Sequence, residues 1–481
     1  MDASAPDASP RRCWTGADDA LGDLDAVGIA EQIASGATTA AEAVEASIAR
    51  AEAAEADLAA FVETDFDRAR ERANDAVPGR FAGLPTAIKD QTAVEGLTLR
   101  FGSNSLAQRA PSTASSPITK IFESIGTVAI GTTSLPEFGL TSSSDFPGRN
   151  PTRNPWNLDH TTGGSSSGAG ALVAAGVLPM AHGGDGGGSI RIPAAACGLV
   201  GLKPSGGRLP HENDEAGLPV KISAYGVLTR TVRDQCAFFA AAEEAYSQNR
   251  LPPIGLVDRP NSRPLRIGVL PSSPINRTPA ASVAEALNST AALLESVGHH
   301  VDVIDEVDDV ITETFADDFI LYWAFLASVL EVRGKKIVDP SFDASGLTPF
   351  TRGLARHAKR NAVRIPGSIR RLRRLHATYD KHLGARDLIV SPTVSDPAPQ
   401  LGHLGRDLDY ETHLDRLAKW AAYTPLHNAV GAPAISLPLG YDTNLGLPVG
   451  IHFASRVGQE RLLLELALQV EEAAPFRHLG G

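Results

Sequence analysis

The sequence is poor in sulfur-containing and aromatic residues. Its 481 residues include three cysteines, two methionines and 6% Phe, Trp and Tyr. The cysteines, at positions 13, 197 and 236, are too few and too scattered for a disulfide framework or for Cys-x-x-Cys metal spacing. A chain without a disulfide framework suits a reducing compartment, so we expect a cytoplasmic protein.

Long apolar runs and an excess of basic charge are also missing. No run of 18 apolar residues occurs, so we expect no membrane-spanning helix. The start, MDASAPDASPRRCW, has acids and prolines where a signal peptide would be basic and then apolar. The formal net charge of −12 argues against nucleic acid or an anionic membrane as the main partner.

Several ligand-binding motifs are absent as well. The chain has no G-x-x-x-x-G-K-[ST] phosphate loop, no dinucleotide fingerprint after a strand and no H-E-x-x-H metal motif. The sequence therefore predicts neither a metal nor another cofactor.

Strand and helix patterns alternate along the chain and predict an α/β protein. Residues 1–17 are polar and rich in proline, so we expect a disordered tail. Residues 131–162 are expected to be mostly loop, with aromatic residues forming a wall. The clearest strand patterns are 266–270, 301–304, 387–390, 434–438 and 447–451, and the clearest helices are 281–296 and 458–472.

Two serines lie in glycine-rich segments. Ser165 follows Gly163-Gly164, and Ser189 follows Gly186-Gly187-Gly188. Glycine lets backbone amides approach a bound group closely. Residues 169–180, AGALVAAGVLPM, predict a buried helix, which would anchor both loops in a core rather than in a flexible linker.

A serine hydroxyl needs a base before it becomes a good nucleophile. No histidine shares a motif with either serine, and His182 is expected in the core. Lys89 ends an apolar strand-like segment, 81–90, and a desolvated lysine can be neutral near pH 7 to 8. A Ser-Lys pair is one known variant of the catalytic triad.

The glycine-rich segments suit an oxyanion hole. The amides of Gly186, Gly187, Gly188 and Ser189 could surround a developing negative charge, which favours Ser189 as the nucleophile. Residues 164–168 also match the G-x-S-x-G nucleophile elbow, which requires a preceding strand, whereas Pro155 and polar turn residues precede it here. An anion-binding nest without catalysis is a further alternative.

These same segments resemble the amidase signature enzymes. The resemblance covers LPTAIKD, TTGGSSSGAGA, GGDGGGSIRIPAAACGLVGLKPS and GAPAISLPLG followed by GLPVGIHF. It implies a mixed twisted β-sheet covered by helices on both faces (an α/β/α sandwich). It also implies one amidase domain, 18–481, with a signature core over 80–210 and a variable, substrate-shaping region over 250–400. The family makes a homodimer plausible and uses no cofactor.

The resemblance also assigns roles to single residues. It implies that Lys89 is the base, that Ser165 bridges after a cis peptide bond, and that Ser189 becomes acylated. Supporting hydrogen bonds would come from Ser166, Asp185 and Arg191. Substrate-pocket positions would be Gly139, Thr141, Ser142, the loop from 141 to 156 and the helical residues 322–325.

Two departures from the usual family pattern are visible, Ser167 in place of a glycine and Gly184 in place of Thr or Ser. The second glycine segment resembles bacterial amidases of the 6-aminohexanoate cyclic dimer hydrolase type. We therefore expect hydrolysis of the amide bond of a small molecule through an acyl-enzyme, with carbamates and esters as further substrates to test. Alternatives are the glutamine amidase subunit of a tRNA-dependent amidotransferase, which the acidic charge disfavours, and an α/β-hydrolase-type esterase with a histidine base.

Overall fold

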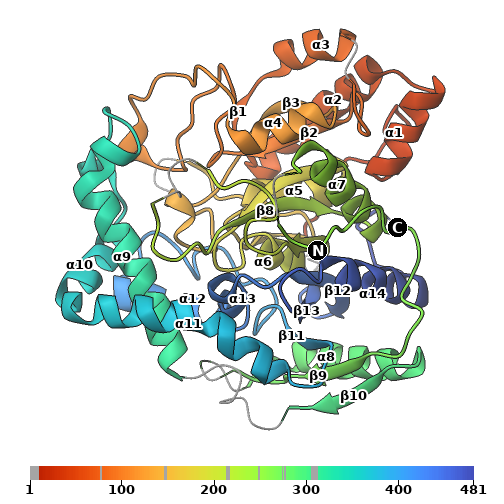
Figure 1. The fold of residues 1–481 in the computed structure, drawn as a ribbon. Helices are drawn as coiled ribbons and strands as arrows, with labels where there is room; N and C mark the ends of the chain where they lie inside the picture. The colour runs from red at the N-terminus through yellow and green to blue at the C-terminus, as the bar shows by residue number, and fades with distance from the viewer. Residues whose placement is uncertain are drawn as a thin grey trace, which may run out of the picture.

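The architecture is an eight-stranded sheet with helices on both faces (Figure 1). The structure, a computed structural model, describes residues 10–75, 78–145, 149–212, 217–247, 250–273, 275, 278–304 and 313–480. The predicted mixed α/β class is confirmed, and the sheet buries apolar residues on both faces.

The large sheet is mixed, with the strand order β10-β9-β11-β13-β12-β7-β8-β6. Neighbours in the first three positions are parallel, and all later pairs are antiparallel. The strands are β6 (Met180–Asp185), β7 (Val200–Lys203), β8 (Ala224–Thr229), β9 (Arg266–Val269), β10 (His300–Val303), β11 (Leu388–Pro392), β12 (Ala434–Asp442) and β13 (Leu447–Ser455). The five strands predicted after residue 265 are therefore present.

A smaller sheet continues beside β6. Its order is β1 (Phe61–Thr64), β3 (Val128–Thr133) and β2 (Pro85–Lys89). Thr86 Oγ1 donates to the Met180 carbonyl at 3.0 Å, and the Lys89 amide donates to His182 Nδ1 at 3.1 Å. These two bonds fix the end of β2 against β6, the strand that leads into the second glycine-rich segment.

Two groups of helices sandwich the large sheet. One face is covered by α5 (Ser167–Ala174) and α6 (Arg191–Cys197), and α2 (Ala40–Leu58) packs on α5 and on the small sheet. The other is covered by α7 (Val232–Ala245), α8 (Ala281–Ser296) and α14 (Glu460–Ala473). The helices α1 (Ala26–Ser35), α3 (Phe66–Asn74) and α4 (Pro117–Ser124) lie near the small sheet (Figure 1).

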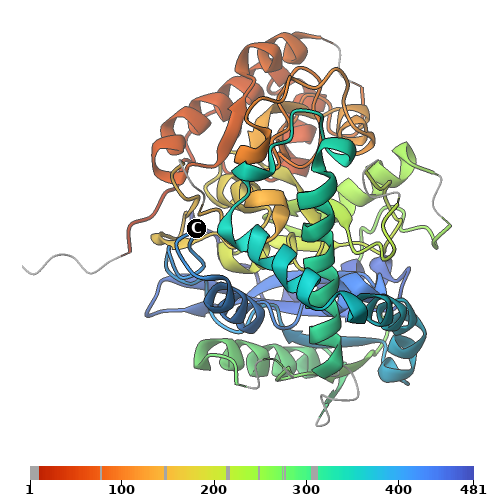
Figure 2. The same cartoon turned by 90° about the vertical axis from the view of Figure 1, so that its left-hand side faces the viewer.

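A further helical layer stands beside this sandwich and faces the viewer in Figure 2. Its longest member, α9 (Glu313–Ile337), packs against α10 (Pro349–Arg360) and α11 (Ile365–Leu383). The short helices α12 (Tyr410–Trp420) and α13 (Pro425–Val430) connect this layer to the strands β12 and β13. Residues 313–385 are therefore largely helical.

The buried helix predicted over 169–180 is shorter than expected. Helix α5 spans Ser167–Ala174, and Met180 already begins β6. Gly176 has a φ of 76°, a left-handed conformation that suits glycine and ends the helix. The residues are buried as predicted, but two elements share them.

The N-terminal segment also differs from the prediction. Residues 1–9 lie outside the described residues, but residues 10–17 pack against the body instead of forming a disordered tail. The Cys13 amide donates to the Pro155 carbonyl, and the Thr15 amide donates to the Ala175 carbonyl, both at 2.9 Å. Cys13 is buried, and burial of apolar side chains opposes the entropy of disorder.

The segment 131–162 contains more regular structure than expected. Strand β3 extends to Thr133, a 3₁₀ turn covers Glu137–Gly139, and β4 (Arg153–Asn154) forms a hairpin with β5 (Asn157–Thr161). Trp156, at the hairpin turn, is buried, and its indole N–H donates to the Cys197 carbonyl at 2.8 Å. Phe146 lies outside the described residues.

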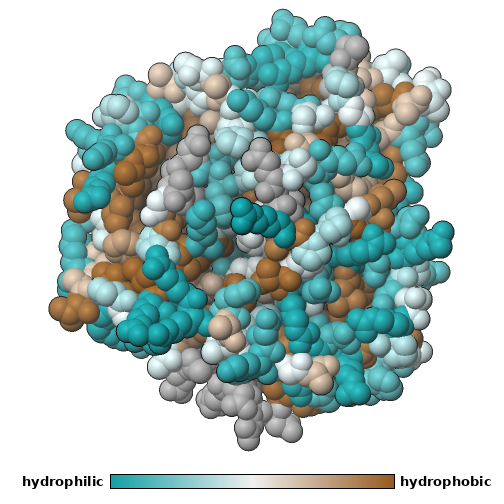
Figure 3. Space-filling model, in the orientation of Figure 1, coloured by the Kyte–Doolittle hydropathy of each residue, from teal (hydrophilic) through white to brown (hydrophobic). Residues whose placement is uncertain are grey.

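The surface in the Figure 1 orientation is mainly hydrophilic, with hydrophobic side chains at the left over α9 and α10 (Figure 3). Exposed apolar residues on α9 include Val332, 71% exposed, and Ile337, 44% exposed. Among the described residues, no helix is both long enough and apolar enough to cross a membrane.

The centre of the large sheet should dominate the stability of the fold. Ile451 on β13 is 0% exposed, so Ile451→Ala should lower the free energy of unfolding by about 2–5 kcal/mol. Val363 is 94% exposed, and Val363→Ala should change it by less than about 0.5 kcal/mol. Urea unfolding followed by circular dichroism measures both, and equal effects would contradict this assignment of the core.

Candidate active site

Lys89 lies at the end of β2 and is completely buried. Its Nζ is 2.9 Å from Ser165 Oγ and donates to the Gly184 carbonyl at 3.1 Å. The lysine therefore joins the first serine segment to β6.

Burial lowers the pKa of Lys89 to about 7, against a smaller opposing effect of Asp185. The adjacent His182 is also buried, and desolvation followed by the charge of Lys89 lowers its pKa to about 3. His182 is a neutral core residue that accepts the Lys89 amide proton. Of these two side chains, the lysine amine is the one that can take up a proton near neutral pH.

The segment that holds Ser165 is fixed by its neighbours. The Gly164–Ser165 peptide bond is cis, as the resemblance implies. The Ser166 hydroxyl donates to the Gly184 carbonyl at 3.3 Å, and the Ser166 amide donates to the Ser189 carbonyl at 3.2 Å. Ser167, the unusual residue here, donates to the Gly163 carbonyl at 2.7 Å. The two serine loops are thus bonded directly to each other.

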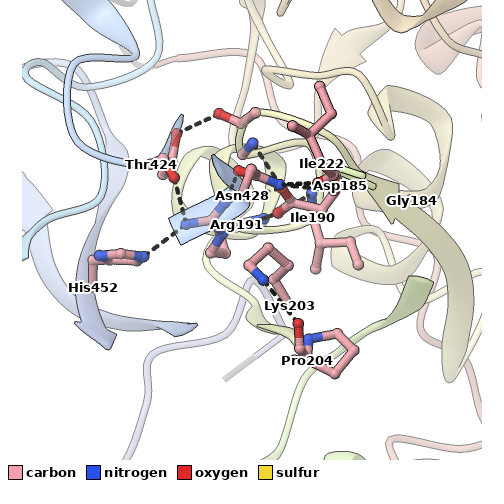
Figure 4. Close-up of polar contacts among 12 residues, drawn as sticks. Gly184, Asp185, Ile190, Arg191, Lys203, Pro204, Ile222, Thr424, Asn428 and His452 are labelled. Atoms are coloured by element: carbon pink, nitrogen blue, oxygen red, sulfur yellow. Dashed lines mark hydrogen bonds and ion pairs between the residues drawn. The ribbon is translucent and has the colours of Figure 1, made fainter. Parts of the chain in front are cut away.

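Asp185 and Arg191 form a buried ion pair at the second loop (Figure 4). Arg191 Nε and Nη2 both donate to the carboxylate at 2.9 Å. The carboxylate also accepts the amides of Gly188 at 2.7 Å and Ile190 at 3.1 Å. Burial alone would raise the pKa of Asp185, but Arg191 and these bonds hold it well below its usual range. Backbone amides of this loop therefore surround a carboxylate that stays ionised.

Three more residues complete this network, and the sequence analysis did not identify them. Asn428 Nδ2 donates to the Asp185 carboxylate at 2.9 Å, while Thr424 Oγ1 donates to the Gly187 carbonyl at 2.7 Å. His452 Nε2 lies 2.9 Å from Arg191 Nη1 (Figure 4). These residues come from the N-terminal cap of α13, from α13 and from β13, more than 230 positions away along the chain. His452 lies within the GLPVGIHF segment, whereas Thr424 and Asn428 lie in none of the segments that carry the resemblance.

One of the four expected oxyanion amides is already occupied. The Gly188 amide donates to Asp185 and is not free, which corrects that part of the prediction. Within the described residues, the amides of Gly186, Gly187 and Ser189 have no hydrogen-bond acceptor. Ser189, 9% exposed, and both of these glycines line the same cavity as Ser165.

A second buried lysine shows that burial alone does not produce this arrangement. Desolvation and the charge of Arg191 lower the pKa of Lys203 to about 7 as well. Its Nζ, however, donates to the Pro204 carbonyl at 2.8 Å and does not line the cavity (Figure 4). Lys89 differs because a serine hydroxyl stands within hydrogen-bond distance.

The cavity over these serines has a volume of about 480 Å³. The predicted pocket residues Gly139, Thr141 and Ser142 line it, and the Thr141 hydroxyl is bonded to His413 Nε2 at 2.8 Å. Its walls are mainly apolar, and α9 contributes Phe315, Phe319, Trp323, Leu326 and Leu330.

Two of the predicted wall residues lie elsewhere. Tyr322 is buried away from the cavity, where its hydroxyl donates to the Val220 carbonyl at 2.6 Å. Trp156 belongs to the core behind α6. Of the residues expected around 322–325, Trp323 and Phe325 line the cavity.

The family model described as Amidase matches residues 42–464. The chain belongs to this amidase family. It is an amide hydrolase, and the resemblance stated from its serine and lysine segments is confirmed.

Relatives and solved structures agree with this membership. A putative amidase, AmiC, of Mycobacterium tuberculosis is 46% identical, covering 96% of this amidase and 97% of the relative. The 6-aminohexanoate-cyclic-dimer hydrolase of Paenarthrobacter ureafaciens is 31% identical, and the match covers 94% of this chain and 95% of the relative. A solved structure of 6-aminohexanoate cyclic dimer hydrolase with substrate superposes with a TM-score of 0.84 at 29% identity, covering 95% of this chain and 98% of that one. The solved structure of a bacterial aryl acylamidase superposes with a TM-score of 0.82 at 25% identity, covering 94% of this chain and 96% of that one.

Removing the Asp185 charge should destabilise the amidase in a pH-dependent way. Asp185→Asn leaves Arg191 buried without its counter-ion, which costs about 3–5 kcal/mol at pH 7. Because the folded pKa is depressed, this stabilisation is present above the ordinary Asp pKa of about 3.9 and is lost as the pH falls through the folded value. The difference in the free energy of unfolding between wild type and Asp185→Asn should therefore become smaller below pH 4. Chemical denaturation at several pH values measures it.

Asp415→Asn is the matched control, because Asp415 is 58% exposed in its pair with Lys419. Exposed pairs contribute about 0–1 kcal/mol, so this variant should remain close to wild type. A similar loss in both variants at pH 7 would contradict the special role of the buried pair.

Proposed function

We propose that this amidase cleaves the C–N bond of a small, largely apolar amide, with Ser189 as nucleophile, Ser165 as proton relay and Lys89 as base. The observation that carries this proposal is the buried Lys89 amine 2.9 Å from Ser165 Oγ, with its pKa lowered to about 7. A neutral amine next to a serine hydroxyl can accept a proton at physiological pH.

The first half-reaction forms an ester on Ser189. Ser189 Oγ attacks the carbonyl carbon, its proton passes to Ser165, and the Ser165 proton passes to Lys89. The carbonyl oxygen becomes an oxyanion, for which the free amides of Gly186, Gly187 and Ser189 are suitable donors. When the tetrahedral intermediate collapses, the C–N bond breaks, and the proton returns through Ser165 to the leaving amine.

The second half-reaction restores the enzyme. Water attacks the acyl ester, its proton follows the same relay to Lys89, and the intermediate releases the carboxylic acid and the Ser189 hydroxyl. Carbamates and esters would acylate the serine by the same steps, so they belong in the substrate panel.

The composition of the cavity supports an apolar substrate. Its charged lining residues among those described are Asp185, which is committed to Arg191, and Arg333. The side chains of Phe319, Trp323 and Leu330 suit an aryl or alkyl group instead. This environment provides little compensation for both charges of a glutamine zwitterion, which disfavours the amidotransferase alternative.

Replacing the nucleophile should abolish both turnover and covalent labelling. Ser189→Ala removes the only atom that the acyl group can join in this mechanism, so turnover of a panel of aryl, alkyl and cyclic amides and carbamates should fall to background. Labelling by a serine-reactive fluorophosphonate, followed by intact-protein mass spectrometry, should also disappear. Ser35→Ala, an exposed position on α1, should retain both. Labelling that survived in Ser189→Ala would reject the assignment.

The pH dependence should follow Lys89. The base must be neutral, so kcat/KM should be full above pH 7 and should decrease about tenfold per pH unit below it, as the amine becomes protonated. Lys89→Met should lower kcat by about 10²–10⁴-fold and remove this inflection. Rate profiles between pH 5 and 9 measure both.

Lys203→Met is the control for this experiment, because Lys203 is also buried with a pKa near 7 but lies outside the cavity. Its profile should retain the inflection. An inflection near pH 6.5 that persisted in Lys89→Met would instead favour the histidine-dependent esterase mechanism.

A further inference from the structure

Gln91 places a carboxamide in the cavity directly beside the proposed proton relay. It follows Lys89 by two residues, and its backbone amide donates to the Lys89 carbonyl at 2.7 Å. Gln91 is half-buried and lines the cavity together with Ser165 and Ser189. It is the only carboxamide among the described lining residues.

Two glycines define where this carboxamide lies. A Cβ built on Gly184 would be 2.3 Å from Gln91 Nε2, so the glutamine occupies the space that a side chain at 184 would take. A Cβ built on Gly139 would be 3.0 Å from Ser165 Oγ and 4.0 Å from Gln91 Oε1. The Gln91 oxygen and the Ser165 hydroxyl therefore border the same small volume above Gly139.

The carboxamide has no hydrogen-bond partner among the described residues. Of the other polar side chains that line the cavity, Thr141 is bonded to His413 and Asp185 to Arg191. A free carbonyl oxygen next to the proton relay is available to a bound substrate.

The proposed reaction requires an acceptor in this volume. With the substrate oxygen on the glycine-loop amides, the leaving nitrogen must direct its lone pair toward Ser165 to receive the returning proton. The N–H of that nitrogen then points elsewhere, and leaving it without an acceptor in a buried site is costly. An acceptor beside Ser165 would satisfy the N–H and fix the orientation of the lone pair.

We infer that Gln91 Oε1 accepts the N–H of the scissile amide and orients its nitrogen toward Ser165, which makes the enzyme selective for substrates whose leaving nitrogen bears a hydrogen. This inference rests on the proposed function. Primary and secondary amides can donate this bond, whereas tertiary amides and esters cannot. Gly184 contributes to this placement of Gln91, because the absence of a side chain at position 184 leaves room for the glutamine.

The test compares matched substrates that share one acyl group and one leaving group, a secondary anilide, its N-methyl anilide and the corresponding phenyl ester. Gln91→Met keeps the length of the side chain and removes the acceptor oxygen and the donor. It should lower kcat/KM for the secondary anilide about tenfold, mainly through kcat, and change kcat/KM for the ester and the N-methyl anilide less than about twofold. Gln32→Met, at an exposed position on α1, should change none of the three.

A double-mutant cycle provides a second, independent variant. Gly184→Ala should displace the carboxamide, so it should lower kcat/KM for the secondary anilide by a larger factor than for the ester; because the Gly184 carbonyl also accepts from Lys89 Nζ, the ratio of the two rates is what is compared. Combining it with Gln91→Met should cost little more than either single change. Thermal unfolding of each variant verifies folding, and if Gln91→Met fails to fold, the selectivity of Gly184→Ala decides.

Equal losses of anilide and ester activity in Gln91→Met would overturn the inference, and so would an undiminished rate on the secondary anilide. Both outcomes leave the proposed function intact, because Ser189→Ala tests it separately on the same substrates. If Ser189→Ala still hydrolysed the anilide, the proposed function itself would fail whatever the result at Gln91.

Discussion

The buried ion pair between Asp185 and Arg191 is the interaction on which the site geometry depends. Both side chains are 0% exposed, so their desolvation must be repaid by hydrogen bonds of good geometry. The Asp185 carboxylate accepts from two Arg191 nitrogens, from Asn428 and from the Gly188 and Ile190 amides. A segment with four glycines in five residues would otherwise have great freedom, and these bonds convert it into a fixed set of amides facing the cavity.

The same ion pair also helps to keep the pKa of Lys89 low. Asp185 opposes the effect of burial on Lys89, because a nearby negative charge favours the ammonium form. That opposing effect stays smaller than desolvation while Arg191 neutralises the carboxylate. The geometry of the proposed oxyanion amides and the protonation state of Lys89 therefore both depend on one arginine. This coupling gives a physical reason for burying a full positive charge so close to a lysine that the proposed mechanism requires to be neutral.

The sequence carried enough local information to predict the amidase family and to propose its reactive residues, but not the residues that support them. Lys89 and the two serines stand in short segments whose glycine content and apolar neighbours are visible without a structure. The strands after residue 265 also follow from simple alternation. By contrast, Thr424 meets Gly187 and Arg191, and Asn428 meets Asp185, only through the complete fold, and nothing in their own neighbourhood indicates it. The Gly188 amide was misassigned for the same reason, because its acceptor is a side chain whose direction depends on Arg191.

The helices α9 and α13, which line the cavity, also lie against the glycine-rich loop before Ser189. This contact limits which substitutions can alter the substrate preference. Helix α9 supplies the aromatic wall, and Thr424, the residue that caps the start of α13, donates to the Gly187 carbonyl. Phe319 of α9 also lies about 3.7 Å from where a Cβ on Gly187 would stand. Substitutions on α9 that reshape the cavity therefore act next to the oxyanion amides. Wall residues farther along α9, near Leu330, can vary with less effect on those amides. Acyl-group preference can thus change at that end of the cavity while the geometry around Ser189 is retained.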